Sequence, residues 1–204
     1  AAPAAAPAAP AAPAAPAAAA PAAPAVPAGS GLTVTAAAQQ PAAQLAPLSG
    51  ARIPFTKATF TASADGDVTV NGLVVERGGQ SVDAVFDGIV LLDEAGIQLG
   101  LAKTLNSQHQ TTLTEAFVVN AGQSRTLTIA GNRTGTANSN HAGMVATISL
   151  VQVNTSATVN GSFPISGTAQ TVNEGLSIGS VTIARGSLDP GTSVTKEVGI
   201  TAYT

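Results

Sequence analysis

The sequence predicts an all-β fold, an Ig-like antiparallel β-sandwich placed between an extended N-terminal arm and a C-terminal segment that pairs along a sheet edge. From residue 31 onward, short runs rich in Thr, Val, Ile and Leu alternate with Gly, Asn and Asp, as strands and turns do. No segment has a convincing helical period of apolar residues. Ala and Pro dominate the chain before that point. We therefore expect an arm over residues 1–30, a sandwich over 31–155 and a C-terminal strand segment over 156–204.

The N-terminal arm is predicted to be extended. Eight of the 13 prolines in the chain lie between residues 3 and 27. Proline removes backbone donors and biases the preceding residue away from helix, so polyproline II is expected rather than a helix or a membrane span. Such an arm serves either as a disordered linker or as a spacer that crosses a cell-wall layer or lies along a neighbouring subunit. The chain starts with Ala rather than Met, and we expect that a signal peptide with a small-residue cleavage site preceded "AAPAAAPA".

Seven strands are expected in the sandwich, because each run is short, β-branched and bounded by turn residues. They cover residues 58–62, 67–76, 82–92, 97–103, 112–119, 124–130 and 144–153. The side chains expected to point inward are Phe60, Val68, Val70, Leu73, Val75, Phe86, Ile89, Leu91, Leu99, Leu101, Leu113, Phe117, Val119, Leu127, Ile129, Val145, Ile148 and Leu150. "LLDEAGIQ" (91–98) and "VVNAGQSRTLTI" (118–129) are each interpreted as a hairpin, since turn residues separate two apolar runs.

Composition excludes several classes of partner. Asp, Glu, Lys and Arg make up only 9% of the chain and the net charge is −3. The few cations are isolated in sequence, so there is no basic stripe to neutralise nucleic acid or to attract anionic membranes, and no membrane insertion is expected. The chain has no Cys, and it therefore has neither disulfides nor thiolate metal sites.

No catalytic constellation is recognisable, so the chain is predicted not to be an enzyme and to need no cofactor. His109 and His141 lie in polar, turn-like surroundings without a third group at metal-ligand spacing, and we interpret them as solvated loop residues. No strained nucleophile motif is present. Asp65 and Asp67 in "ADGDV" could join Asp83, Asp87, Asp93 or Glu94 in a calcium site, but an Asp-Gly turn is favoured because the full calcium-loop motif is missing.

Three Asn-x-Ser/Thr triplets are candidate glycosylation acceptors in a secreted protein: Asn132, Asn154 and Asn160. All three fall in predicted loops or strand ends. Two other loops, 104–111 and 131–143, are candidates for contact with a ligand.

The C-terminal segment resembles the start of the globular region. With a shift of 149 residues, "LTVTAAAQQPAAQL" (32–45) lies over "VTIARGSLDPGTSV" (181–194). This is either an internal repeat or the convergence of two units that combine a strand with a proline turn. An isolated pair of strands needs partners, and sparse charge defends sheet edges poorly. The segment either adds to the sandwich of its own chain, frays as the truncated start of a following tandem module, or pairs with a neighbouring subunit. Pairing with a neighbouring subunit is the expected outcome, with Val181, Ile183, Val198 and Ile200 as donor-strand residues.

An Ala/Pro stalk, a Thr-rich and Lys-poor β region and the stretch "GSVTIARGSLDPGTSV" resemble the repeated β-sandwich ectodomains of prokaryotic surface-layer and surface-filament proteins. The resemblance implies an extracellular structural subunit that forms a homo-oligomer or polymer and contacts a cell wall or surface. The alternative is an adhesin or ligand-binding surface module without catalysis.

Overall fold

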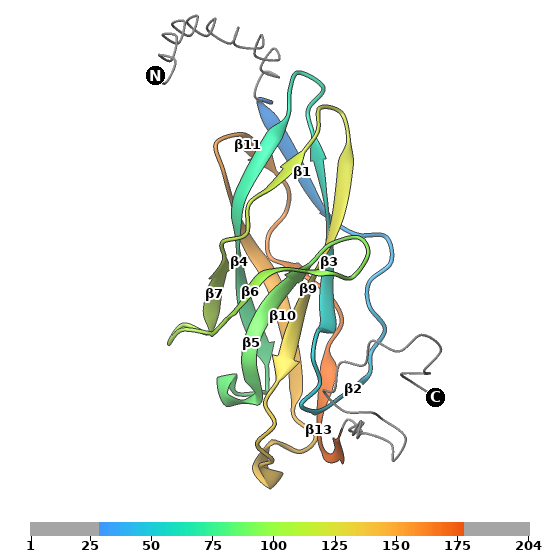
Figure 1. Ribbon diagram of the computed structural model, residues 1–204, viewed down its shortest axis with the longest axis vertical. Helices are drawn as coiled ribbons and strands as arrows, with labels where there is room; N and C mark the ends of the chain where they lie inside the picture. Colours follow the sequence, from blue (N-terminus) through green and yellow to red (C-terminus); the bar gives the residue numbers. More distant parts are fainter. Residues whose placement is uncertain (1–28, 178–204) are drawn as a thin grey trace, which may run out of the picture.

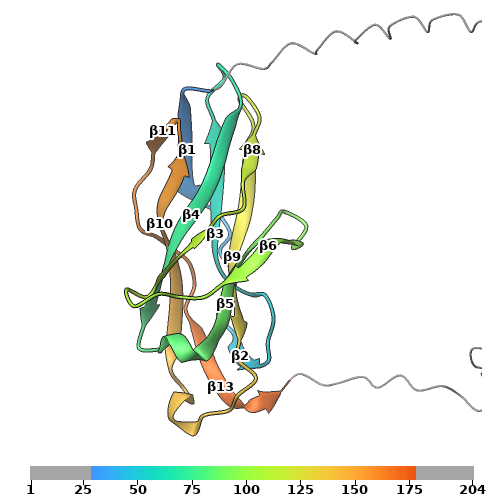
Figure 2. The same cartoon turned by 60° about the vertical axis from the view of Figure 1, so that its left-hand side comes forward.

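The computed structural model describes residues 29–177, which fold into two packed β-sheets (Figures 1 and 2). Residues 1–28 of the expected arm, the second of the two similar stretches (181–194) and all four donor-strand candidates (Val181, Ile183, Val198 and Ile200) lie outside the described residues. The predicted all-β sandwich is confirmed. In the described part of the chain, the helical elements are two 3-10 turns, η1 (Asp83–Val85) and η2 (Ser139–His141), and neither could cross a membrane.

Each sheet combines strands that are distant in sequence. The first sheet has the order β11 (Thr158–Asn160), β1 (Gly31–Ala36), β3 (Ile53–Ala62), β9 (Ser124–Arg133), β5 (Phe86–Leu92) and β6 (Gln98–Lys103). The second has the order β2 (Leu45–Leu48), β13 (Gln170–Ser177), β10 (Val145–Thr155), β4 (Val68–Gly79) and β7 (Gln110–Leu113); β8 (Phe117–Val119) also pairs with β4, and β12 (Ile165–Ser166) with β10. Pairing is antiparallel except for β1 with β11 and β2 with β13.

The expected alternation of buried and solvent-facing residues is clearest in β3. Ala58, Phe60 and Ala62 are buried, whereas the intervening Lys57, Thr59 and Thr61 are only partly buried. This period of two is what a strand with one face on a core requires. β3 thereby presents one apolar side to the second sheet.

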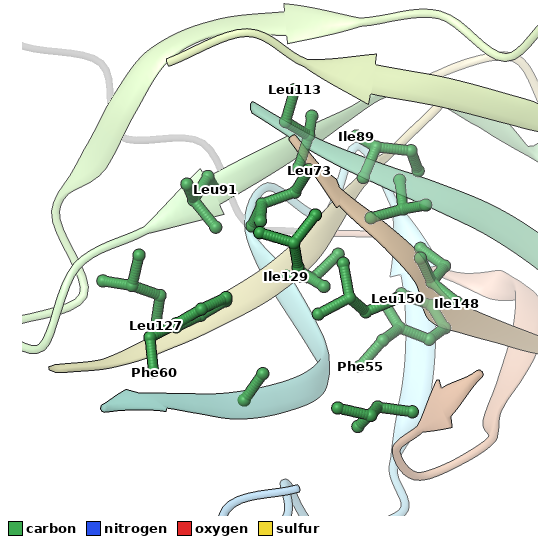
Figure 3. Packing of buried hydrophobic residues seen from close by; sticks show 14 of the residues in the cluster. Phe55, Phe60, Leu73, Ile89, Leu91, Leu113, Leu127, Ile129, Ile148 and Leu150 are labelled. Carbon is green, nitrogen blue, oxygen red and sulfur yellow. The ribbon is translucent and has the colours of Figure 1, made fainter. Parts of the chain in front are cut away.

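The core lies between the two sheets and is built mainly of aliphatic side chains with a few Phe rings (Figure 3). Phe60 is fully buried, and its ring meets that of Phe117 edge to face, with centroids 5.2 Å apart. Thr56 adds a polar link inside this core, because its hydroxyl donates to the Ile148 carbonyl of the second sheet and accepts from the Gly167 backbone N–H. A buried hydroxyl with partners avoids the cost of an unpaired polar group.

The list of inward side chains is correct for most positions but wrong for Leu101, which is 74% exposed. The register explains the error. Ile89 faces Lys103 and Leu91 faces Leu99, so three residues of β6 oppose one residue of β5. Gly100, at φ +64°, lies in this bulge, and a bulge re-aims the side chains beside it. Leu99 and Val145 are only partly buried.

One of the two predicted hairpins is wrong. β5 and β6 pair across the Asp93–Ile97 turn as expected. Residues 118–129 do contain a turn, but β8 pairs with β4 in the second sheet while β9 pairs with β3 and β5 in the first. This connection therefore passes from one sheet to the other. The predicted strand over 112–119 is likewise divided into β7 and β8.

The sandwich extends beyond its expected boundary at residue 155. β11 joins the first sheet, while β12 and β13 join the second. Gln170 ties β13 into the fold: its fully buried amide accepts from the Gln44 backbone N–H at 2.7 Å and donates to the carbonyls of Ala42 and Pro54. Residues 156–177 are thus part of the domain rather than of a separate C-terminal segment.

Candidate functional site

The described chain enters and leaves the sandwich at opposite ends. β1 begins at one end of the long axis and β13 finishes at the other (Figures 1 and 2). Pairing agrees with the pictures: Leu32 lies opposite Ala62 at the last residue of β3, whereas Leu48, beside Ser177, lies five residues before the first residue of β3, Ile53. The ten residues of β3 span roughly 30 Å at about 3.3 Å per residue. The chain before residue 29 and the chain after residue 177 are therefore attached at opposite poles of the sandwich.

Three of the four outermost strands, β6, β2 and β11, are blunted without much charge. The bulged β6 receives the Glu115 carboxylate beside its Leu101 N–H, at 3.5 Å. β2 contains Pro47, and β11 has only three residues. Bulges, prolines and short strands are recognised ways of preventing edge association. The expectation of poorly defended edges, drawn from the scarcity of charge, is therefore wrong for these three edges.

A groove of about 530 Å³ lies on the outer side of the first sheet. It is lined by Pro41, Ala42, Gln44, Arg52, Pro54, Lys57, Leu92, Asp93, Glu94, Ala95, Gly96, Thr126 and Thr128. Strands β3 and β9 contribute Lys57 and the two threonines. The Gln170 amide holds Ala42 and Gln44 against Pro54 and so fixes one wall. The volume is within the range of small-molecule sites.

The groove is lined by two acidic and two basic side chains, Asp93, Glu94, Arg52 and Lys57. Glu94 binds Arg125 through two hydrogen bonds of 2.8 and 3.0 Å. The Arg125 bonds, which outweigh the effect of burial, lower the pKa of Glu94. Asp93 is occupied by the backbone N–H groups of Ala95 and Ile97. Within residues 29–177, Lys57 and Arg52 take part in none of the ion pairs, which leaves both cations able to meet an anionic group.

The two loops considered for ligand contact flank the same turn, η1. His109, from the 104–111 loop, contacts Asp83 with Nδ1 at 2.7 Å from the carboxylate, and Arg77 binds the other oxygen at 2.5 Å. Burial opposes the charge on Asp83, but His109 and Arg77 outweigh it and lower the pKa of this carboxyl group. The interpretation of His109 as a solvated loop residue omitted this side-chain contact with Asp83, which joins residues 26 positions apart.

Arg133, in the 131–143 loop region, forms a buried ion pair with Glu174 of β13. The guanidinium group contacts the carboxylate at 2.7 Å and donates to the Val85 carbonyl at 2.8 Å. The side chains are 0% and 8% exposed. The backbone N–H of Asn138 donates to the second Glu174 oxygen, and Asn138 also contacts His141. The pair fixes β13 to the end of β9, which is a structural role.

The carboxylates considered for calcium serve other purposes. Asp65 accepts the Ser30 backbone N–H, and hydrogen bonds from Ser63 and Ser30 lower its pKa to about 2. Asp67 accepts the Ala121 backbone N–H. Residues 29–177 contain no group of three or more His, Cys, Asp or Glu side chains that could hold a metal ion. The favoured interpretation, an Asp-Gly turn between strands, agrees with the turn between β3 and β4.

The three candidate glycosylation acceptors differ in access. Asn132 is partly buried in β9, and its amide oxygen accepts the Arg52 backbone N–H. Asn154 is partly buried in β10 and accepts from Gln152. Asn160 is the exposed last residue of β11. Of the three, Asn160 is the most accessible acceptor.

Comparison with known proteins adds little. The chain matches no protein-family model and no curated protein. Among solved structures it is similar to a family 123 glycoside hydrolase from Clostridium perfringens, with 9% sequence identity and a TM-score of 0.29 over 63% of this chain. The match spans 21% of the hydrolase.

Proposed function

We propose that this chain is an extracellular structural subunit that assembles with copies of itself into a surface filament or lattice, joined by strand pairing of its C-terminal segment. In this proposal the chain associates with copies of itself and catalyses no reaction. The observation that carries it is the position of the two ends: the sandwich is entered at one pole and left at the other. A segment that leaves at one pole meets the next subunit head to tail, and such heterologous contacts propagate when they do not close into a ring.

Deleting residues 178–204 is expected to convert polymers into single particles, because the donor strands are lost while β13 is kept to Ser177. Negative-stain electron microscopy measures the assembly, and far-ultraviolet circular dichroism checks that the β signal is retained. Val181→Asp with Ile183→Asp should act like the deletion, since alternate residues of an added strand enter the partner's core. Thr182→Asp with Ala184→Asp adds the same charge on the opposite face of the added strand and is the matched control. Polymers that persist without residues 178–204 would contradict the proposal.

A second candidate function, a non-catalytic adhesin or ligand-binding surface module, is favoured by the groove. Lys57 and Arg52, which line the groove outside the described ion pairs, and the Thr126 and Thr128 hydroxyls suit an anionic, hydroxyl-rich ligand. Lys57→Glu is then expected to abolish binding to immobilised acidic polysaccharides while assembly continues. Thr61→Glu, on the same side of β3 outside the groove, is the control. Alanine replacement of loops 104–111 and 131–143 tests those loops in the same assay.

A further inference from the structure

We infer that the recipient of the C-terminal segment is the β1 position: residues 179–185 of one copy replace β1 in the next copy. This inference rests on the proposed function and names its contact site. β1 is the first strand of the described domain, so it can leave its place without unthreading any other strand. The β6 and β2 edges, by contrast, are already blunted by a bulge and a proline.

The β1 position has a simple chemical pattern. β1 lies between β3 and β11, with Leu32 to Ala36 opposite Ala62 to Ala58. Leu32 is 0% exposed and Val34 is 1% exposed. Thr33, Thr35 and Ala36 are exposed. A strand that fills this position therefore needs apolar side chains at two alternate places and tolerates polar ones between them.

The C-terminal segment has this pattern at a shift of 149 residues. Val181 falls on Leu32 and Ile183 on Val34, so both buried places receive aliphatic side chains. Thr182, Ala184 and Arg185 fall on the three exposed places. The one charge of this stretch thus reaches solvent.

The backbone at the start of β1 sets where the match begins. A side chain at Gly31 would have its Cβ 3.7 Å from its nearest neighbour, an ordinary contact, so Ser180 fits there. At Gly29 the added Cβ would lie 2.4 Å from the Gly66 carbonyl oxygen. Ile178, which the shift places on Gly29, is too large, and the replacing strand must start after it. Ser30 contributes its backbone N–H to Asp65, and Gly179 supplies the same donor.

Geometry makes the replacement intermolecular. Ser177 ends β13 at the pole opposite Gly31, and the length of β3, roughly 30 Å, separates those poles. Two residues separate Ser177 from Ser180, and three peptide steps span at most about 11 Å. A chain therefore cannot place its own Ser180 at its own Gly31, whereas the adjoining pole of a second copy is within reach.

The exchange conserves most contacts, since one short β-branched strand replaces another. Exchange of an element between copies is a low-cost route to association, and here the incoming strand has the same pattern of buried and exposed positions as β1. Because β1 is tethered to its own domain, it competes with the incoming strand for this position at a high effective concentration. Assembly should therefore depend steeply on protein concentration.

Locking β1 in place tests the inference. The chain lacks Cys, so a disulfide between introduced cysteines is unambiguous. Thr33→Cys with Thr61→Cys joins register partners of β1 and β3, and the oxidised full-length protein is expected to lose polymers that return on reduction. Thr61→Cys with Ser124→Cys joins β3 to β9, whose hydroxyls lie 2.7 Å apart, and should assemble whether oxidised or reduced. Polymers from oxidised Thr33→Cys/Thr61→Cys would overturn the exchange while leaving the proposed function intact.

Mixing two variants locates the contact. One chain carries Thr182→Cys and the other carries either Thr61→Cys or, as the control, Leu101→Cys. The Thr61→Cys mixture is expected to yield about tenfold more disulfide-linked dimer, because cross-strand partners have Cβ atoms about 5 Å apart. Leu101 lies on β6, four strands from β1. Mass spectrometry identifies the linked peptides. Preferential linkage to Leu101→Cys, or equal linkage to both, would move the recipient away from β1. Absence of polymers in the unmodified protein would refute both the inference and the proposed function.

Discussion

Replacing Arg133 by Met is expected to lower the free energy of unfolding by about 3–5 kcal/mol, because the substitution leaves a buried carboxylate without its counter-charge. Arg133 is fully buried, and its partner Glu174 is 8% exposed. The substitution also removes one of the two donors to the Val85 carbonyl and leaves the Thr134 backbone N–H. Urea unfolding at pH 7, followed by circular dichroism, measures the loss.

Two variants show whether burial of the ion pair is the cause. Arg125→Met breaks the Arg125–Glu94 pair, whose side chains are 30% and 46% exposed, and should cost about 1 kcal/mol or less. Arg133→Met combined with Glu174→Leu removes both charges and should recover much of the stability. Equal losses for Arg133→Met and Arg125→Met would contradict the assignment of a buried, stabilising pair.

Acid should weaken the same pair. Burial raises the pKa of Glu174, but the Asn138 N–H and the Arg133 guanidinium group outweigh this effect and hold the pKa below 4.5, its ordinary value. A carboxyl group with a lowered folded-state pKa contributes stability above its ordinary pKa and loses it as the pH falls through the folded value. Stability should therefore decrease below about pH 4.5. Glu174→Gln should be less stable at pH 7 and lack this part of the pH dependence.

Phe60→Ala is the second large effect, with an expected loss of about 3–5 kcal/mol from the cavity it leaves. Phe60 is 0% exposed, contacts the Phe117 ring and lies opposite Val34 of β1. Calorimetry should show a clearly lower Tm. Phe60→Leu should cost less because it fills more of the space, and Thr59→Ala, one residue earlier and only partly buried, should change stability by about 0.5 kcal/mol or less. A loss for Phe60→Ala no larger than that for Thr59→Ala would be inconsistent with this packing.

The central strands could be predicted because each carries its own periodic pattern. β3, β4, β5, β9 and β10 cover most of the expected runs, and their inward aliphatic residues are buried except for Val145, which is partly buried. The strands that were not predicted have little pattern to detect. β12 has two residues, β11 has three, and β2 contains a proline. Among the residues described in β13, only Gln170 and Val172 are buried as whole residues, and Glu174 is buried only at its side chain, so tertiary contacts determine that it is a strand.

Features that depend on contacts between residues far apart in the chain could not be predicted from the sequence. The exposure of Leu101 follows from the β5–β6 bulge, and local alternation cannot reveal a register shift. Arg133 and Glu174 are 41 positions apart, and Gln170 binds Gln44 from 126 positions away. The groove combines the 41–44 segment with strands β3, β5 and β9. Composition could not predict that the sheet edges are blunted, because bulges and short strands do not change the number of charged residues.

The placement of β1 and β13 at opposite poles also determines how the domain carries tension. A pull applied between Gly29 and Ser177 acts along the long axis, nearly parallel to β1. The hydrogen bonds that join β1 to β3 run perpendicular to the strands. They are therefore loaded together in shear instead of being opened one after another, and the first strand resists extraction as a unit. For the single domain under load, mechanical strength would then be set by the rate of forced unfolding rather than by equilibrium stability. In the assembly inferred above, the strand that replaces β1 would be loaded in the same shear geometry.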